Sequence, residues 1–243
     1  MTTRADKFLV EHGYAASRAE AQAAIHAGNV WVDGTLVGRS SQPIAADAIV
    51  IYEKSHPYVS RGALKLVAAL ERFDLSPSGL TCIDVGASTG GFTQALLERG
   101  AAKVYAVDVG HGQMRGELTS DPRVVVLEGV NARDLNAVHV PDAADAIVVD
   151  VSFISLRLVL PAALNLARSG AWLVVLVKPQ FEVGRENVGK GGIVKDEAAR
   201  DHALKDIVDW LGAQRGWTVE GQMDSPVAGG DGNREFLVAA RKA

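Results

Sequence analysis

Hydrophobic and polar positions follow one pattern for most of the chain, from about residue 60 onward. Continuous apolar runs alternate with longer stretches whose apolar residues recur every three to four positions, which predicts buried strands followed by amphipathic helices. The expected strands are Thr81–Val85, Lys103–Asp108, Val124–Glu128, Ala146–Val151, Ala171–Lys178, Thr218–Met223 and Glu235–Ala240. The expected helices are Arg61–Phe73, Gly91–Arg99, Ile154–Arg168 and Asp196–Arg215. This alternation predicts an α/β fold with a mostly parallel sheet that helices cover on both faces.

The first 54 residues carry shorter elements. Ser17 and Glu20 form a capping box that begins a helix, which Gly28 ends. The other expected elements are a helix over Arg4–Glu11, a hairpin over Val30–Val37 around Asp33-Gly34, and a strand over Ala48–Tyr52. We therefore expect a small α+β domain over residues 1–54, a linker over 55–59 that contains Pro57, and a larger domain over 60–243.

Composition restricts the class of protein. The chain has 243 residues, 48% of them hydrophobic, with 25 basic and 29 acidic side chains. The longest apolar run, Ala171–Val177, is far shorter than the roughly 20 residues of a membrane span, and the first residues contain no apolar signal segment. The single cysteine, Cys82, excludes an intramolecular disulfide and a cysteine-rich zinc site. We expect a globular cytoplasmic protein that contacts no membrane and requires no metal, while the net charge of −4 leaves its partner open.

A glycine-rich turn follows the first strand of the larger domain. Gly86, Gly90 and Gly91 have the spacing G-x-x-x-G-G, which differs from the G-x-G-x-x-G fingerprint of dinucleotide-binding proteins. Asp84 precedes the turn, and Asp108 ends the next strand about 20 residues later, where a carboxylate can accept hydrogen bonds from ribose hydroxyls. The turn resembles the first motif of S-adenosylmethionine-dependent methyltransferases. The cofactor contacts that this resemblance implies are Asp84, Gly86, Gly90, Gly91, Phe92, Asp108, Asn131 and Asp150.

A second glycine-rich segment, Gly184–Gly191, matches the start of a phosphate-binding loop, G-x-x-x-x-G-K. It lacks the Ser or Thr that would hold Mg²⁺, and Gly191-Gly192 disfavours an immediate helix. We therefore expect a loop near the substrate and no nucleotide hydrolysis.

Four charged residues lie at the ends of apolar elements. Lys65 lies on the helix before the first strand, while Asp150, Lys178 and Glu235 lie at strand ends. A charge is costly in an apolar core, so these side chains are expected to face a common pocket. Ser60-Arg61-Gly-Ala-Leu-Lys65-Leu, Asp150, Lys178 and Arg234-Glu235 match the Lys-Asp-Lys-Glu tetrad of FtsJ-type RNA 2′-O-methyltransferases.

The small N-terminal domain resembles the S4 RNA-binding domain. The resemblance rests on Arg4-Ala-Asp-Lys7-Phe-Leu, Ser17-Arg18 and Gly28-Asn-Val30-Trp-Val32-Asp-Gly34. It implies that Arg4, Lys7 and Arg18 face RNA phosphates, and Arg61 is the RNA-binding residue expected from the larger domain. With both domains, residues 1–243 resemble the TlyA-type, haemolysin-A-like family of ribosomal RNA ribose methyltransferases.

This resemblance implies a Rossmann-like class I methyltransferase, with a mostly parallel seven-stranded sheet, behind an S4 domain. The implied cofactor is S-adenosylmethionine, and the implied partner is ribosomal RNA within ribosomal subunits, with a cytidine of 16S or 23S rRNA as target. A lysine amine beside a second cation in a partly dry site loses its proton more readily. Lys178 is the expected base, Lys65 the second cation, and Asp150 and Glu235 the groups that orient the two amines.

Three alternatives remain open. An RNA base methyltransferase would share the cofactor site, but many such enzymes carry Asn/Asp-Pro-Pro-Tyr/Phe where this chain has Asp150-Val-Ser-Phe153. A membrane-lytic protein is suggested by the word haemolysin alone. A non-catalytic RNA-binding module would not need the tetrad, and a methyl-transfer assay separates it from an enzyme.

Overall fold

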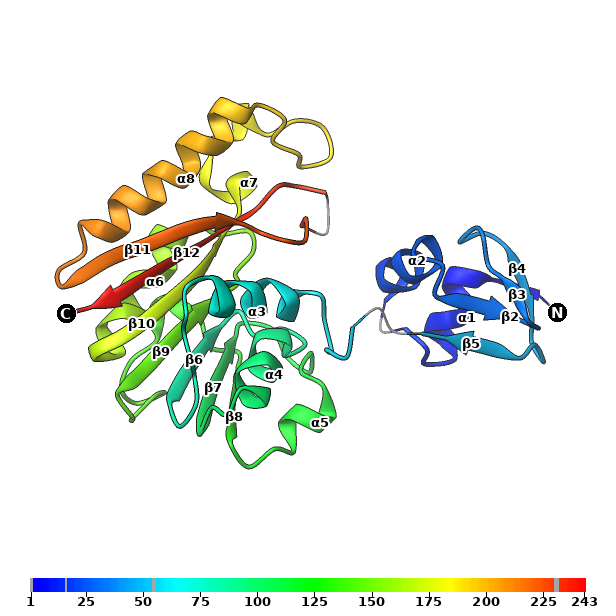
Figure 1. The fold of residues 1–243 in the computed structure, drawn as a ribbon, viewed down its shortest axis with the longest axis horizontal. Helices are drawn as coiled ribbons and strands as arrows, with labels where there is room; N and C mark the ends of the chain where they lie inside the picture. Colours follow the sequence, from blue (N-terminus) through cyan, green and yellow to red (C-terminus); the bar gives the residue numbers. More distant parts are fainter. Residues whose placement is uncertain (1, 16, 54–55, 230–231) are drawn as a thin grey trace. The chain divides into compact units, whose positions relative to one another are not determined.

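The chain forms two compact units, Met1–Pro57 and Tyr58–Ala243, in a computed structural model that describes residues 2–15, 17–53, 56–229 and 232–243 (Figure 1). The domain boundary expected at residue 54 and the start of the linker at residue 55 lie outside the described residues. Each unit has its own hydrophobic core, so each is described by itself.

The N-terminal unit combines two short helices with two small antiparallel sheets. Its elements are β1 (Thr2–Arg4), α1 (Ala5–Glu11), α2 (Arg18–His26), β2 (Val30–Val32), β3 (Thr35–Leu36), β4 (Pro43–Ala45) and β5 (Val50–Tyr52). The sheets have the strand orders β1-β4 and β3-β2-β5. Asp33 and Gly34 both have positive φ angles, of 49° and 77°. Two successive positive φ angles are typical of the tight hairpin turn that the Asp-Gly pair predicts.

The helix start in this unit is also as expected, because Ser17 accepts a hydrogen bond from the Glu20 backbone N–H at 3.2 Å. The strands β1 and β4 were not expected. Each has three residues, which is too short for an alternating pattern to stand out from the sequence.

The larger unit is built on a seven-stranded sheet. Its elements are α3 (Gly62–Arg72), β6 (Thr81–Val85), α4 (Gly91–Glu98), β7 (Lys103–Asp108), α5 (Gly116–Thr119), β8 (Val124–Glu128), η1 (Ala132–Asp134), β9 (Ala144–Val149), α6 (Leu156–Leu166), β10 (Ala167–Val177), α7 (Pro179–Glu182), η2 (Arg185–Asn187), α8 (Glu197–Gly212), β11 (Trp217–Asp224) and β12 (Phe236–Lys242). The strand order is β11-β12-β10-β9-β6-β7-β8, and β12 is antiparallel to both of its neighbours. The predicted α/β class with a mostly parallel seven-stranded sheet is confirmed.

Two apolar layers cover this sheet, as the near-continuous apolar strands predict. On β6, Cys82 packs with α3 and α4, while Ile83 and Val85 pack on the other face with α6 and α8. Figure 1 shows α3 and α4 on the same side of the sheet. Successive side chains of a strand point to opposite faces of the sheet, so one strand contributes side chains to both apolar layers.

One element boundary differs from the expectation. The helix predicted over Ile154–Arg168 ends at Leu166, and β10 begins at Ala167. Ala167 pairs with Ala144 of β9, and the Arg168 guanidinium forms an ion pair with Asp145. Pairing with a neighbouring strand therefore overrides the helical pattern of the last two residues.

The strand order places a crevice at a defined point of the sheet. The chain passes from β6 to β7 and β8 on one side and from β9 to β10 on the other, so the order reverses between β6 and β9. Ligands of open α/β sheets bind beyond the carboxyl ends of the strands at such a point. Gly86 follows β6 and Asp150 follows β9, so both lie at this point.

Candidate active site

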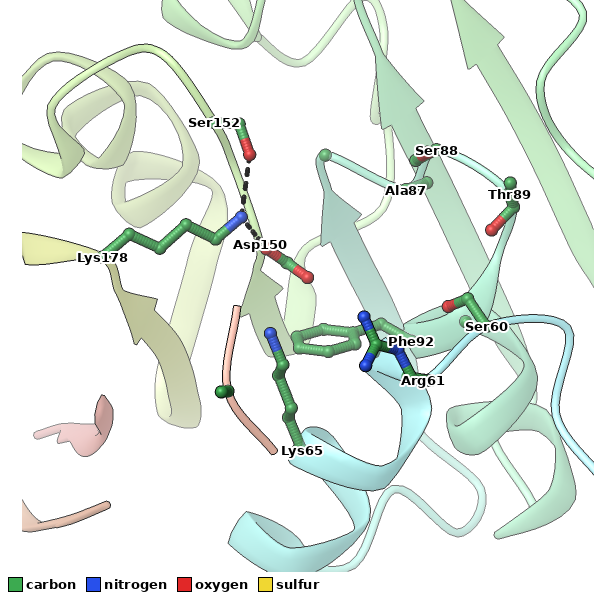
Figure 2. A pocket seen from close by; sticks show the side chains of 14 residues that line it. Ser60, Arg61, Lys65, Ala87, Ser88, Thr89, Phe92, Asp150, Ser152 and Lys178 are labelled. Carbon is green, nitrogen blue, oxygen red and sulfur yellow. Dashed lines mark hydrogen bonds and ion pairs between the residues drawn. The ribbon is translucent and has the colours of Figure 1, made fainter. Parts of the chain in front are cut away.

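Lys178 and Asp150 meet at the carboxyl ends of two adjacent parallel strands. The Lys178 Nζ lies 2.6 Å from the Asp150 Oδ1 and donates a hydrogen bond to the Ser152 Oγ at 2.8 Å (Figure 2). The side chains of Lys178 and Asp150 are 12% and 21% exposed. The amine is thus largely removed from water but remains open toward a cavity.

Lys65 and Glu235 form a second, more deeply buried pair. The Lys65 Nζ lies 2.5 Å from the Glu235 Oε2, and the two side chains are 9% and 2% exposed. Figure 2 shows Lys65 and Lys178 pointing from different elements toward the space beside Asp150. The four residues expected to converge therefore form two amine–carboxylate pairs, which places two cations near one space without an excess of charge.

A cavity of about 420 Å³ opens beside these pairs. Its walls come from the start of α3, the glycine-rich turn and the strand ends, and the lining residues are Ser60, Arg61, Gly62, Lys65, Gly86, Ala87, Ser88, Thr89, Gly91, Phe92, Asp150, Ser152, Lys178 and Ala228. Figure 2 shows Lys65 on α3, and Arg61 directly before this helix, facing this space opposite Lys178. The cavity is polar and basic, which suits an anionic or hydroxyl-bearing ligand.

A second cavity of about 450 Å³ shares a wall with the first. Gly86, Ser88, Asp150 and Ser152 line both. The second cavity is otherwise lined mainly by apolar side chains, together with the polar residues Asp108, Gln113 and Asn131. An apolar slot with a few fixed polar groups is typical of a nucleoside site.

Asp108 is held in place by backbone donors. One carboxylate oxygen accepts from the Ser88 N–H at 2.8 Å, and the other accepts from the Gly110 N–H at 2.7 Å. Each oxygen keeps a further lone-pair position for a ligand hydroxyl. Asn131 caps the short helix η1, because its Oδ1 accepts from the Arg133 N–H at 3.1 Å.

Gly86 is required by a close approach between two loops. Its φ is +85°, and an added Cβ would lie 2.3 Å from the Asp150 carbonyl oxygen. Any side chain at this position would push apart the two strand ends that carry the candidate site.

Asp84 and Gly90 are not among the described residues that line the two cavities, so their expected contact with the cofactor stays a prediction. Asp84 is fully buried and accepts a hydrogen bond from the Thr93 hydroxyl at 2.7 Å. Gly90 packs against Leu118, because a Cβ there would lie 2.2 Å from the Leu118 Cδ1.

Burial raises the pKa of Asp84 to about 7, and the nearby Asp150 charge adds to this effect against the opposing hydrogen bond from Thr93. The unfolded carboxyl has a pKa near 4, so the folded state binds more protons between about pH 4 and pH 7. The free energy of unfolding should therefore fall as the pH rises through this interval, by up to about 4 kcal/mol.

In Asp84→Asn this pH-dependent contribution to the free energy of unfolding is absent. Urea unfolding at pH 5 and pH 8 should show the variant gaining stability relative to wild type at the higher pH, and parallel pH curves would contradict the assignment.

The basic residues expected to face RNA are anchored by carboxylates in the N-terminal unit. Asp6 is fully buried, and its carboxylate accepts hydrogen bonds from Arg4 at 3.1 Å, from Arg18 at 2.8 Å and from Gln22 at 2.8 Å. These bonds, with Arg4 the strongest contributor, hold the pKa of Asp6 far below its usual range. Arg4 and Arg18 remain more than half exposed, so Asp6 fixes two guanidiniums that still face solvent.

Lys7 is similarly exposed and lies 3.3 Å from Glu11 one helical turn away. An exposed pair of this kind contributes little stability, so the Lys7 amine stays available to a stronger anion.

The sequence analysis missed several residues that line the cavities. They are short polar side chains or loop residues, including Ser60, Ser88, Gln113, Ser152 and Phe153. Phe153 has a positive φ of 66°, is 90% exposed, and lies 5.0 Å from the Phe181 ring. A strained backbone with an exposed aromatic ring beside a cavity is a functional signal, but the φ angle is invisible in the sequence.

Two features are absent from the described residues. No helix among them is long and apolar enough to cross a bilayer. No group of three or more His, Cys, Asp or Glu side chains is arranged there to hold a metal ion.

Comparison with known families divides the chain as the two units do. The FtsJ-like methyltransferase family matches residues 58–242, and the S4 domain matches residues 3–50. The chain is 44% identical over 240 residues to the 16S/23S rRNA (cytidine-2′-O)-methyltransferase TlyA of Mycobacterium tuberculosis, which covers 98% of this chain and 89% of the relative.

Solved structures agree with this grouping. A structure from Streptococcus thermophilus that carries a hemolysin name is 38% identical, covers 100% of this chain and 89% of its own, and superposes with a TM-score of 0.80. An O-methyltransferase of Bacillus cereus, solved with SAH, is 17% identical with a TM-score of 0.53 over 76% of this chain and 82% of its own, and it shares the fold. The chain therefore belongs to the TlyA family of FtsJ-like methyltransferases.

Proposed function

We propose that this chain transfers a methyl group from S-adenosylmethionine to the 2′-hydroxyl of a cytidine ribose in ribosomal RNA. The observation that carries the proposal is the wall shared by the two cavities, where Asp150 lies and pairs with Lys178, which lines the basic cavity. An apolar cavity with a fixed carboxylate on one side and a basic cavity on the other suit a nucleoside cofactor and a ribose hydroxyl, respectively.

The second cavity fits the cofactor by the chemistry of its lining. Asp108 offers two oriented oxygens to ribose hydroxyls, and the apolar side chains Val109, Val130 and Ile154 can enclose an adenine ring. S-adenosylmethionine supplies an electrophilic methyl group on a sulfonium sulfur, and sulfur keeps the electron pair of the C–S bond when that methyl leaves. A sulfonium of this kind needs no metal for activation, so the protein has to position the hydroxyl and accept its proton.

Lys178 is the proposed acceptor of the hydroxyl proton. The amine lines the basic cavity and contacts Asp150 and Ser152 of the wall that this cavity shares with the second one, so a hydroxyl bound in the basic cavity can lie beside it. Asp150 fixes the amine, while Lys65 lines the same cavity and can donate to the ribose oxygen as negative charge develops on it. Glu235 does not line either cavity and acts through Lys65, as a positioning residue.

RNA as the substrate is supported by features of both units. Arg4 and Arg18 form an exposed cationic pair on the N-terminal unit, and Arg61 lines the basic cavity of the larger unit. The exposed ring of Phe153 beside the cavity can stack on an unpaired base, as aromatic side chains do in many RNA complexes. Cytidine is proposed because the relative from Mycobacterium tuberculosis is named for that target.

The alternatives are less well supported. Base methylation would require a group next to Asp150 that binds the target amine. In this chain the segment Asp150-Val-Ser-Phe153 contacts the Lys178 amine at this place instead, through Ser152. A membrane-lytic role would be favoured by a long apolar helix, which the described residues lack. A non-catalytic module would have no use for two buried amine–carboxylate pairs.

Replacing Asp108 by alanine should weaken binding of S-adenosylmethionine by about 10- to 150-fold, because two charge-assisted hydrogen bonds to the ribose are lost, at about 1.5–3 kcal/mol in all. Calorimetry with the cofactor measures the loss. Asp121→Ala is the matched control, since Asp121 is a loop carboxylate that pairs with Arg123 and lines neither cavity. Equal affinities of both variants would exclude Asp108 as a cofactor ligand.

The direct test of the proposed function is transfer of a tritiated methyl group to purified small subunits, large subunits and naked ribosomal RNA. At least one of the three should be labelled above the enzyme-free control. Absence of label in all of them, with cofactor binding intact, would contradict the proposal.

A further inference from the structure

We infer that Ser152 is a positioning residue that aims the lone pair of the Lys178 amine at the reacting hydroxyl. The inference rests on the proposed function, because it assigns a partner to the proposed base. Ser152 is not part of the Lys-Asp-Lys-Glu tetrad, yet its Oγ lies 2.8 Å from the Lys178 Nζ and its side chain lines both cavities.

A neutral lysine amine carries two N–H groups and one lone pair in a tetrahedral arrangement. The Ser152 Oγ takes one N–H group at 2.8 Å, and the Asp150 Oδ1, an ion-pair partner at 2.6 Å that makes no hydrogen bond in this structure, is the acceptor available to the other. The lone pair then has to point into the remaining direction. With Asp150 alone, the amine could rotate about its Cε–Nζ bond and the direction of the lone pair would be undefined.

Ser152 is itself held independently of Lys178. The segment 150–155 is fastened to the segment 178–182 by Glu182, which accepts from the Ser155 hydroxyl at 2.6 Å and from the Leu156 N–H at 2.8 Å. The rings of Phe153 and Phe181 add an apolar contact at 5.0 Å. These contacts hold the residues that directly follow Ser152 in the chain, so its hydroxyl is a positioned acceptor before substrate binds.

The proton and the electrons balance in this arrangement. The 2′-oxygen forms a bond to the methyl carbon, the C–S bond breaks with its electron pair remaining on sulfur, and the hydroxyl proton moves to the Lys178 Nζ. The amine becomes an ammonium whose three N–H groups face Asp150, Ser152 and the methylated oxygen. Ser152 accepts from the amine in both states and is neither oxidised nor protonated.

The charged groups that face this amine are Asp150 from the end of β9, Lys65 from α3 and Arg61 from the residue before α3, while Glu235 acts through Lys65. Replacing Ser152 by alanine changes none of these charges. The substitution removes one hydrogen-bond acceptor. A hydrogen bond to this acceptor is stronger from an ammonium than from a neutral amine, so its loss disfavours the ammonium form. Loss of the hydroxyl should therefore move the pH midpoint of the chemical step to lower pH while also lowering the maximal rate.

The test compares Ser152→Ala, Ser152→Thr and the control Ser120→Ala in single-turnover methyl transfer across pH, on the full chain with a substrate that wild type labels. Ser152→Ala should lose about 10- to 100-fold in maximal rate with its midpoint shifted to lower pH. Ser152→Thr should recover both, because threonine keeps the hydroxyl and the exposed position has room for a methyl group. Ser120→Ala removes the hydroxyl of an exposed serine that lines neither cavity, so its rate and midpoint should stay at the wild-type values.

Trace acetic anhydride labelling, read by mass spectrometry, follows the Lys178 amine without turnover. Its labelling midpoint in Ser152→Ala should move in the same direction as the rate midpoint. Wild-type rates and midpoints in Ser152→Ala would overturn the inference, as would a rate loss with an unmoved midpoint.

Failure of the proposed function has a different signature. If Lys178→Ala methylates as wild type does, Lys178 is not the base and the proposed mechanism fails. If Lys178→Ala is inactive while Ser152→Ala behaves as wild type, the inference about Ser152 alone is overturned.

Discussion

Lys178→Ala should lower the single-turnover rate of methyl transfer by about 10²- to 10⁴-fold, the range that general base catalysis contributes. Affinity for S-adenosylmethionine should be unchanged, because the amine faces the hydroxyl side of the shared wall and acts in the transition state. Rapid-quench measurement with saturating enzyme separates the chemical step from binding and product release. The rate should rise with pH through one ionisation that belongs to the coupled site as a whole.

Lys178→Arg is the informative companion of this variant. Guanidinium remains protonated throughout the accessible pH range, so it can supply a positive charge but cannot accept the hydroxyl proton. We therefore expect no rescue. Lys205→Arg serves as control, because Lys205 is an exposed lysine that pairs with Asp209 on α8. Near-normal turnover by Lys178→Arg would mean that a fixed positive charge suffices, and the base would have to be sought elsewhere.

Replacing Arg4, Lys7 and Arg18 together by alanine should weaken binding to ribosomal RNA by about 100-fold at moderate salt and flatten its salt dependence. Each lost phosphate contact should reduce the slope of log K against log salt by about 0.7–0.9. The structural reason is that Asp6 holds two of these side chains in one orientation while more than half of each remains exposed. Filter binding across a salt series measures both quantities.

The matched control exchanges the side chains without changing their charge: Arg4→Lys, Lys7→Arg and Arg18→Lys. It should keep most of the salt slope. Cofactor affinity should be unchanged in both triple variants, since these residues belong to a different unit from the cavities. An unchanged salt slope in the alanine variant would show that the N-terminal unit binds RNA through other groups or not at all.

The sequence predicted three of the parallel strands best. β6, β7 and β8 begin and end where the apolar pattern places them, because each has a nearly continuous apolar run in the sequence. Strands β1 and β4 were missed, since three residues carry no periodicity. The start of β10 was misplaced, since strand pairing and an ion pair decide residues 167 and 168.

The candidate site was predicted in outline but not in its contacts. The ends of parallel strands meet at one edge of the sheet, so topology alone brings Asp150 near Lys178. Which side chain points into a cavity is decided by the local alternation and turn, so the sequence did not show that Asp84 is fully buried and hydrogen-bonded to Thr93. Ser152 escaped notice because a serine in a loop has no distinguishing pattern, and only its contact with Lys178 reveals its position.

The central claim, methylation at a ribose oxygen, is tested most directly by nucleoside mass spectrometry of ribosomal RNA from subunits incubated with the full chain and S-adenosylmethionine. Digestion to nucleosides separates a sugar methyl from a base methyl by fragment mass. The account predicts new 2′-O-methylcytidine that is absent when Lys178→Ala replaces the wild-type chain. New methyl groups found on a base, or the same 2′-O-methylcytidine produced by Lys178→Ala, would contradict it.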